Sequence, residues 1–170
     1  MRLFSGKIAS LSEEITKALV DAHDIECESK KEVAKDIEAV FTNYLQIERE
    51  VTDKAQEVVR SRGLPFNEVG RIKKVMAEQK GIKLDEDLLD FLLDQLVEIL
   101  MHSGNVDEVF VEDHVLRKTM RPLLRKHGAI EDELETEVRG KMKHVQEGSR
   151  TWEVEYKRIM ADVQRRKGLS

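Results

Sequence analysis

The sequence is poor in the residues that build disulfide-bonded, loop-rich or membrane-spanning proteins. Its 170 residues include one cysteine, Cys27, so no intramolecular disulfide can form and a reducing compartment is expected. Two prolines, nine glycines and 5% aromatic residues are too few for many short strands joined by tight turns. No stretch of about 18 apolar residues occurs, and no apolar signal-peptide segment follows Met1. These absences predict a cytoplasmic, all-α protein without membrane contact.

The charged residues are abundant but evenly mixed in sign. They make up 37% of the chain, with 34 acidic against 29 basic residues and a net charge of −5. This balance excludes the overall positive field that drives non-specific nucleic-acid binding, although local basic clusters remain. Hydrophobic residues amount to 40%, which is enough for a core. The composition therefore favours long helices with one buried and one solvated face.

The apolar pattern of the first half of the chain recurs in the second half. The matching segments are residues 3–25 with 84–106, 33–59 with 116–142, and 73–78 with 157–162. In the last pair, Lys-Lys-Val-Met-Ala-Glu matches Lys-Arg-Ile-Met-Ala-Asp, which is identical or chemically equivalent at every position. The chain is therefore predicted to consist of two tandem, pseudo-symmetric repeats, residues 1–81 and 82–170.

Each repeat is predicted to contain three helices. Those of the first repeat are expected at residues 5–24, 29–62 and 65–80, and the last helix of the second repeat at 150–167. Ser29 and Glu32 have the spacing of a capping box, so a long helix should begin there. Pro65 is tolerated in a first helical turn, which places the start of the third helix near it.

The long second helices carry an apolar seam with coiled-coil spacing. In the first repeat the seam consists of Val33, Ile37, Val40, Tyr44, Ile47 and Val51, and in the second of Leu116, Met120, Leu123, His127, Ile130 and Leu134. Alternating steps of four and three residues keep such a seam facing one partner helix. The two long helices are therefore predicted to pair as a stalk, and the same surface could support a homodimer.

Three residues are expected to disturb the second seam. Pro122 removes a backbone donor and Gly128 loosens the chain nearby, so a kink or break is predicted between residues 119 and 130. His127 takes the seam position that Tyr44 has in the first repeat. Packing accounts for a histidine there, and its protonation at mildly acidic pH would loosen the seam.

The sequence contains no recognised catalytic or metal-binding constellation. None of the five histidines has a glutamate three residues before it, and no His-Glu-x-x-His motif occurs. His114 with Glu112 or Asp113 is a weak metal candidate, because adjacent residues point to different helix faces. Cys27 has no recognisable base to activate it. The chain is therefore interpreted as a non-enzymatic protein without a cofactor.

Several short motifs resemble a known family. They are Gln-Glu-Gly-Ser-Arg-Thr-Trp-Glu-Val-Glu-Tyr at residues 146–156, Arg-Arg-Lys-Gly at residues 165–168 and the opening Met-Arg-Leu, which resemble the bacterial family called domain of unknown function 507. The resemblance covers the whole chain as two tandem copies, with Glu-Gly-Ser before tryptophan intact only in the second. It implies an all-helical bacterial protein whose family has no established activity, so no site residue can be carried over.

Basic residues form two candidate phosphate-binding clusters. The first consists of Arg117, Lys118, Arg121, Arg125 and Lys126, and the second of Lys73 and Lys74 with the matching Lys157 and Arg158. Acidic residues such as Glu131-Asp132-Glu133 lie close by in the sequence and aromatic residues are sparse, which weakens the case for phosphate contact. Nucleic-acid binding through basic helix faces is therefore the alternative function.

Trp152 and Tyr156 form a candidate partner surface. They lie on the apolar stripe of the last expected helix. Such aromatic residues either anchor a partner or dock into the protein's own core. The duplicated seam favours a protein with two pseudo-equivalent arms that hold helical partners. We therefore predict a helical scaffold or adaptor that acts through contacts with protein partners of unknown identity.

Overall fold

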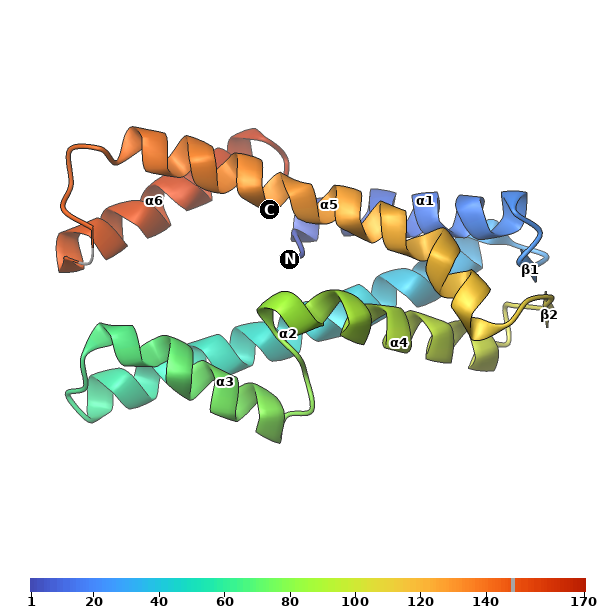
Figure 1. The fold of residues 1–170 in the computed structure, drawn as a ribbon, viewed down its shortest axis with the longest axis horizontal. Coiled ribbons are helices and arrows are strands. Elements are labelled where there is room, and N and C mark those ends of the chain that lie inside the picture. Colours follow the sequence, from blue (N-terminus) through green and yellow to red (C-terminus); the bar gives the residue numbers. More distant parts are fainter. Residues whose placement is uncertain (148) are drawn as a thin grey trace.

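The computed structural model describes residues 1–147 and 149–170, which form an all-α protein with one very short sheet. The helices are α1 (Ile8–Asp21), α2 (Lys30–Ser61), α3 (Val69–Gln79), α4 (Leu88–His102), α5 (Asp113–Lys141) and α6 (Arg150–Arg166). Strands β1 (Ile25–Glu26) and β2 (Glu108–Val109) pair antiparallel as a small ribbon. The predicted helical fold class is confirmed (Figure 1). Gly148, part of the Glu-Gly-Ser motif, lies outside the described residues.

Local signals in the sequence set several helix boundaries. The Ser29 hydroxyl accepts a hydrogen bond from the Glu32 amide at 3.4 Å, which is the serine half of the predicted capping box, while the Glu32 carboxylate pairs with Lys35 at 3.1 Å. Ser149 caps α6 in the same way by accepting from the Trp152 amide at 3.1 Å. Beyond the end of α3, Gly81 has a φ of 72°, a left-handed conformation that favours glycine and ends the helix.

A four-helix core is formed by α1, α4 and the N-terminal halves of α2 and α5. Both α1 and α4 pack against α2 as well as α5. The fully buried side chains of this core include Ile15, Leu19, Ile37, Phe41, Leu92, Leu96, Leu116, Met120 and Leu124. Both halves of the sequence therefore contribute to one core.

The predicted pairing of the two long helices as a stalk is wrong. Within the described part of the chain, α2 and α5 share no extended contact, because α1 and α4 lie against both of them. Seam residues such as Ile37 and Leu116 are fully buried in the four-helix core. A 3.5-residue apolar repeat requires a partner but does not specify which helix supplies it.

The C-terminal halves of α2 and α5 leave the core as two arms. We name them the α2–α3 arm and the α5–α6 arm, because α3 packs along α2 and α6 along α5. Figure 1 shows the arms on the left, the chain ends between them and the β1–β2 ribbon on the right. A second core fills the α5–α6 arm and consists of Leu134, Val138, Met142, Met160, Val163 and Leu169 together with Phe4. Phe4 therefore packs in the arm formed by the end of the chain, whereas its neighbour Leu3 belongs to the four-helix core.

The helix α5 passes through Pro122 without a break. It is continuous from Asp113 to Lys141, and Figure 1 shows its axis changing direction between its yellow and orange parts. Proline has no amide hydrogen, so the carbonyl four residues before Pro122 loses its helical hydrogen bond. Pro122 is exposed, so water can reach this carbonyl instead. The disturbance predicted between residues 119 and 130 is thus a bend.

Candidate functional site

The space between the arms contains two hollows, one at its base and one at the arm tips. The base hollow has a volume of about 510 Å³ and lies beside the N-terminal residues, α2 and the start of α4. Its lining carries both signs of charge. Lys73 Nζ pairs with Glu48 at 2.6 Å, and the Met1 ammonium lies 3.5 Å from Glu131. The two charges in each of these ion pairs cancel, so the hollow has no strong preference for an anion or a cation.

Tyr44 is one of the buried residues that line the base hollow. Its hydroxyl donates a hydrogen bond to the Lys83 carbonyl at 3.0 Å. Burial, assisted by the negative charges of Glu48 and Asp85, raises the pKa of Tyr44 above its ordinary value. The phenol therefore stays protonated at neutral pH and joins α2 to the segment that precedes α4.

The tip hollow has a volume of about 530 Å³ and is lined by both arms. Phe66 of the α2–α3 arm and Val154 of α6 line it, and they are 43% and 61% exposed. Lys157 Nζ lies 5.6 Å from the centre of the Phe66 ring, so a cation–π contact links the arms. The charged residues of the lining are Arg60, Arg150, Lys157 and Glu153. The tip hollow is therefore open, partly apolar and net positive, which are properties of a binding site.

The candidate partner residues Trp152 and Tyr156 lie half-buried against the second core. Their rings stack with centroids 5.0 Å apart, and the Tyr156 hydroxyl donates a hydrogen bond to Glu135 on α5. The Arg139 guanidinium lies 5.7 Å from the centre of the Trp152 ring. Burial and the Glu135 carboxylate raise the pKa of Tyr156. Both aromatic side chains thus join α6 to α5.

The first basic cluster is partly neutralised by α4. Arg117 pairs with Asp94 at 2.6 Å and Arg121 pairs with Asp90 at 2.9 Å. Lys118, Arg125 and Lys126 are exposed on the same helix. Two of the five predicted phosphate contacts therefore already have carboxylate partners, which lowers the positive charge that this face presents.

The second basic cluster is divided between the two arms. Lys73 and Lys74 lie on α3, whereas Lys157 and Arg158 lie on α6. Lys73 pairs with Glu48, and Arg158 pairs with Glu155 at 2.8 Å. Lys74 is exposed. Of these four residues, Lys157 alone lines the tip hollow, so the residues that match in sequence do not form one patch.

The described residues hold no metal-binding cluster, and the Cys27 thiol is not activated. Residues 1–147 and 149–170 bring together no three His, Cys, Asp or Glu side chains that could hold a metal ion. His114 Nδ1 lies 3.3 Å from Glu112, and both side chains are exposed. Burial and the charge of Asp107 raise the pKa of the Cys27 thiol, which keeps it in the unreactive protonated form.

His127 of α5 is buried against the N-terminal segment. Its Nε2 accepts a hydrogen bond from the Phe4 amide at 3.3 Å, which requires a neutral ring with its proton on Nδ1. Burial lowers the pKa of His127, Lys7 lowers it further, and Glu14 opposes the shift. The histidine therefore connects α5 to the N-terminal segment only while it is neutral.

Acidification is expected to destabilise the protein through His127. Because its folded pKa lies below the unfolded value of about 6.5, the contribution is present above that pH and is lost as pH falls through the folded pKa. His127→Gln keeps a hydrogen-bond acceptor for the Phe4 amide but does not titrate. Urea unfolding at pH 5 to 8 should show a steeper loss of stability in the parent than in His127→Gln. Parallel curves for the two proteins would contradict this expectation.

The tip hollow was not predicted from the sequence. Phe66 falls in the first turn of the helix expected at residues 65–80, and nothing in the sequence distinguishes it from a residue that packs within its own arm. Val154 did carry a signal, because it is an apolar residue on the face of α6 opposite Trp152 and Tyr156. These two residues line one hollow because of how the two arms run in space. No local sequence pattern predicts that arrangement.

Together, the fold and the hollows define an all-α protein with a shared core and two helical arms. A family model described as "Protein of unknown function (DUF507)" matches residues 1–169, so the chain belongs to this family, as its motifs predicted. No curated protein matches the chain. Across the described residues, no helix has both the length and the apolar composition needed to cross a membrane.

Proposed function

We propose that this protein is a non-enzymatic helical scaffold or adaptor of the bacterial cytoplasm that acts through protein–protein contacts at its arm tips. The observation that carries the proposal is the tip hollow, in which Phe66 and Val154 remain exposed although the α5–α6 arm has its own core and the α2–α3 arm packs as an extension of the four-helix core. Removal of these apolar side chains from water by a partner stabilises the complex. The surrounding arginine and lysine residues favour a partner that carries acidic groups.

A tandem duplication accounts for the paired arms of this proposed scaffold. The order helix, strand, long helix, short helix occurs once in residues 1–81 and again in residues 82–170. The two strands pair with each other, and α1 and α4 have the same two helical neighbours. In this interpretation each repeat contributes one arm, and the tip hollow is the place where both repeats meet a partner.

Affinity purification from the native bacterium tests the adaptor role. The tagged parent protein should retain a partner protein after nuclease treatment at about 0.1 M salt. Phe66→Ser with Val154→Ser should lose that partner, because both changes remove apolar area from the tip hollow. Val75→Ser is the matched control, since Val75 is also exposed on a helix but does not line the hollow.

The alternative function has a different signature in the same experiment. Recovery of nucleic acid that is lost with increasing salt, and that is weakened by Arg117→Ala with Arg121→Ala and Arg125→Ala, would overturn the adaptor proposal. Retention of every partner by the Phe66→Ser and Val154→Ser variant would also overturn it, because the tip hollow would then not be the contact surface.

A further inference from the structure

The two ends of the long axis of the molecule carry opposite charge. The ribbon end, on the right in Figure 1, presents exposed Glu26, Glu28, Asp107, Glu108, Glu112 and Asp113, opposed by Lys30 and Lys31. The arm tips, on the left, present Arg60, Arg150 and Lys157 in the tip hollow, opposed by Glu153. Surfaces with opposite potential attract one another and fix the orientation in which two proteins meet.

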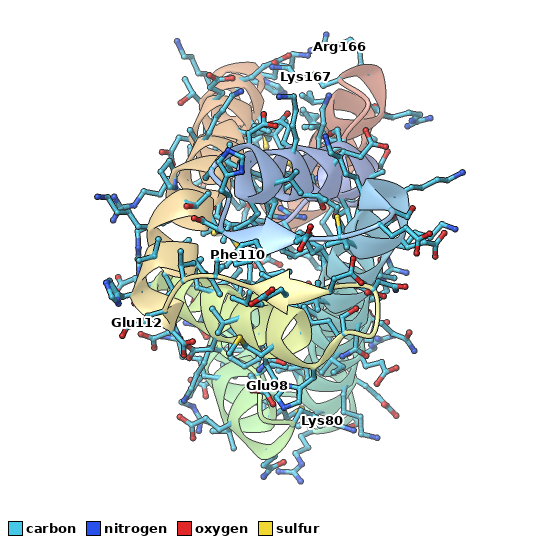
Figure 2. The ribbon with its side chains drawn as sticks, turned by 90° about the vertical axis from the view of Figure 1, so that its right-hand side faces the viewer. Lys80, Glu98, Phe110, Glu112, Arg166 and Lys167 are labelled. Carbon is cyan, nitrogen blue, oxygen red and sulfur yellow. The ribbon has the colours of Figure 1, made fainter. Side chains whose placement is uncertain are left out.

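Each end also carries exposed apolar side chains. Phe110, directly after β2, is 51% exposed, and Met101 in the last turn of α4 is exposed as well. Figure 2, which looks onto the ribbon end, shows Phe110 there with Glu98 and Glu112. At the opposite end, Phe66 and Val154 line the tip hollow. Both ends therefore combine an apolar centre with a charged surround, which is the usual anatomy of a binding patch.

We propose that the ribbon end of a second copy of this chain occupies the tip hollow, with Phe110 as the apolar anchor, so that the protein assembles head to tail. This inference rests on the binding role proposed for the arm tips and names the occupant. The hollow of about 530 Å³ falls in the range of about 300–1,000 Å³ that accommodates ligands of drug size, so it has room for an aromatic side chain. The acidic residues beside Phe110 would meet Arg60, Arg150 and Lys157.

A head-to-tail contact has a consequence that a symmetric dimer lacks. The two surfaces in contact differ, so each added copy leaves one tip hollow and one ribbon end unoccupied. Assembly therefore continues beyond the dimer as protein concentration rises. Because opposite charges contribute to the contact, high salt weakens it.

Sedimentation velocity of the purified full-length protein tests this assembly. Over a concentration series at about 0.1 M salt, the parent should form dimers and then larger species, and the association should weaken at about 1 M salt. Phe110→Ser should weaken self-association at least about tenfold, as expected for an interface anchor. Phe66→Ser with Val154→Ser should have the same effect, and Val75→Ser should behave like the parent.

Mixing the two deficient variants gives the sharpest outcome. Phe110→Ser retains an intact tip hollow, and the Phe66→Ser and Val154→Ser variant retains an intact ribbon end. Neither should assemble alone, but an equimolar mixture should form a one-to-one complex that does not grow further. A parent that stays monomeric at every concentration, or a mixture that stays unassociated, overturns the proposal.

The result also separates this inference from the adaptor role. If Phe110→Ser self-associates like the parent, the ribbon end is not the occupant and the inference fails. A second outcome combines both experiments. If the parent is monomeric in sedimentation, and affinity purification shows that it binds a different protein that Phe66→Ser with Val154→Ser does not bind, the inference fails and the adaptor role stands. Binding of nucleic acid at the arm tips in place of a second copy overturns both.

Discussion

Replacement of Phe4 by alanine is expected to lower the free energy of unfolding by about 3–5 kcal/mol. Phe4 is 2% exposed and is packed in the second core with residues of α5 and α6. Its removal leaves a cavity that the surrounding helices can fill only partly, because they are held by their own connections. The backbone amide that donates to His127 is unchanged, so the loss reports the packing of the ring. Urea denaturation of the purified protein measures it.

Two exposed phenylalanines provide matched controls for Phe4→Ala. Phe66 and Phe110 are 43% and 51% exposed, so the same deletion there should change stability by about 0.5 kcal/mol or less. A loss at Phe4 no larger than at these two positions would contradict the placement of Phe4 in the second core.

The second core also predicts where the Phe4→Ala variant unfolds first. The four-helix core and the second core are separate clusters of buried residues, so the α5–α6 arm can open while the four-helix core remains folded. Amide hydrogen exchange should therefore accelerate in α6 more than in α1 or α4. Equal acceleration in all helices would show that the two cores unfold as one unit.

Helix positions could be predicted from the sequence because their signals are local. The capping pair Ser29 and Glu32 and the glycine after α3 fix the boundaries through backbone hydrogen bonds and φ angles. The partners of those helices are not local information. The seam through Ile37 correctly indicated a long helix with one buried face. It did not indicate that α1 and α4, and not α5, pack against that face.

The candidate site was less predictable than the fold. Trp152 and Tyr156 were recognised as aromatic residues on an apolar stripe, and the structure places them between α6 and α5. The basic residues were recognised by charge alone. Asp94 and Asp90, which pair with Arg117 and Arg121, lie more than 20 residues earlier in the sequence, so the pairing could not be predicted. Contacts between distant segments decide both cases, and they follow from packing of the whole chain.

The close contact between the chain ends explains why an alanine at position 6 is expected to be costly. The Gly6 amide donates to the Leu169 carbonyl at 2.8 Å, and an added Cβ would lie 2.3 Å from the Gly168 carbonyl oxygen. The obstructing atoms belong to the backbone, so they cannot rotate away as a side chain would. Gly6→Ala should therefore lower the free energy of unfolding by about 1–3 kcal/mol.

A glycine in open surroundings gives the opposite expectation and completes the test of Gly6. Gly140 lies inside α5 with nothing near its missing Cβ, so Gly140→Ala should raise stability by about 0.5–1 kcal/mol through reduced chain entropy. Thermal unfolding should thus shift in opposite directions for the two variants. If the cost at Gly6 arises from displacing Leu169 from the second core, Gly6→Ala should cost less in a Leu169→Ala background. Additive losses would instead place the cost in the N-terminal turn itself.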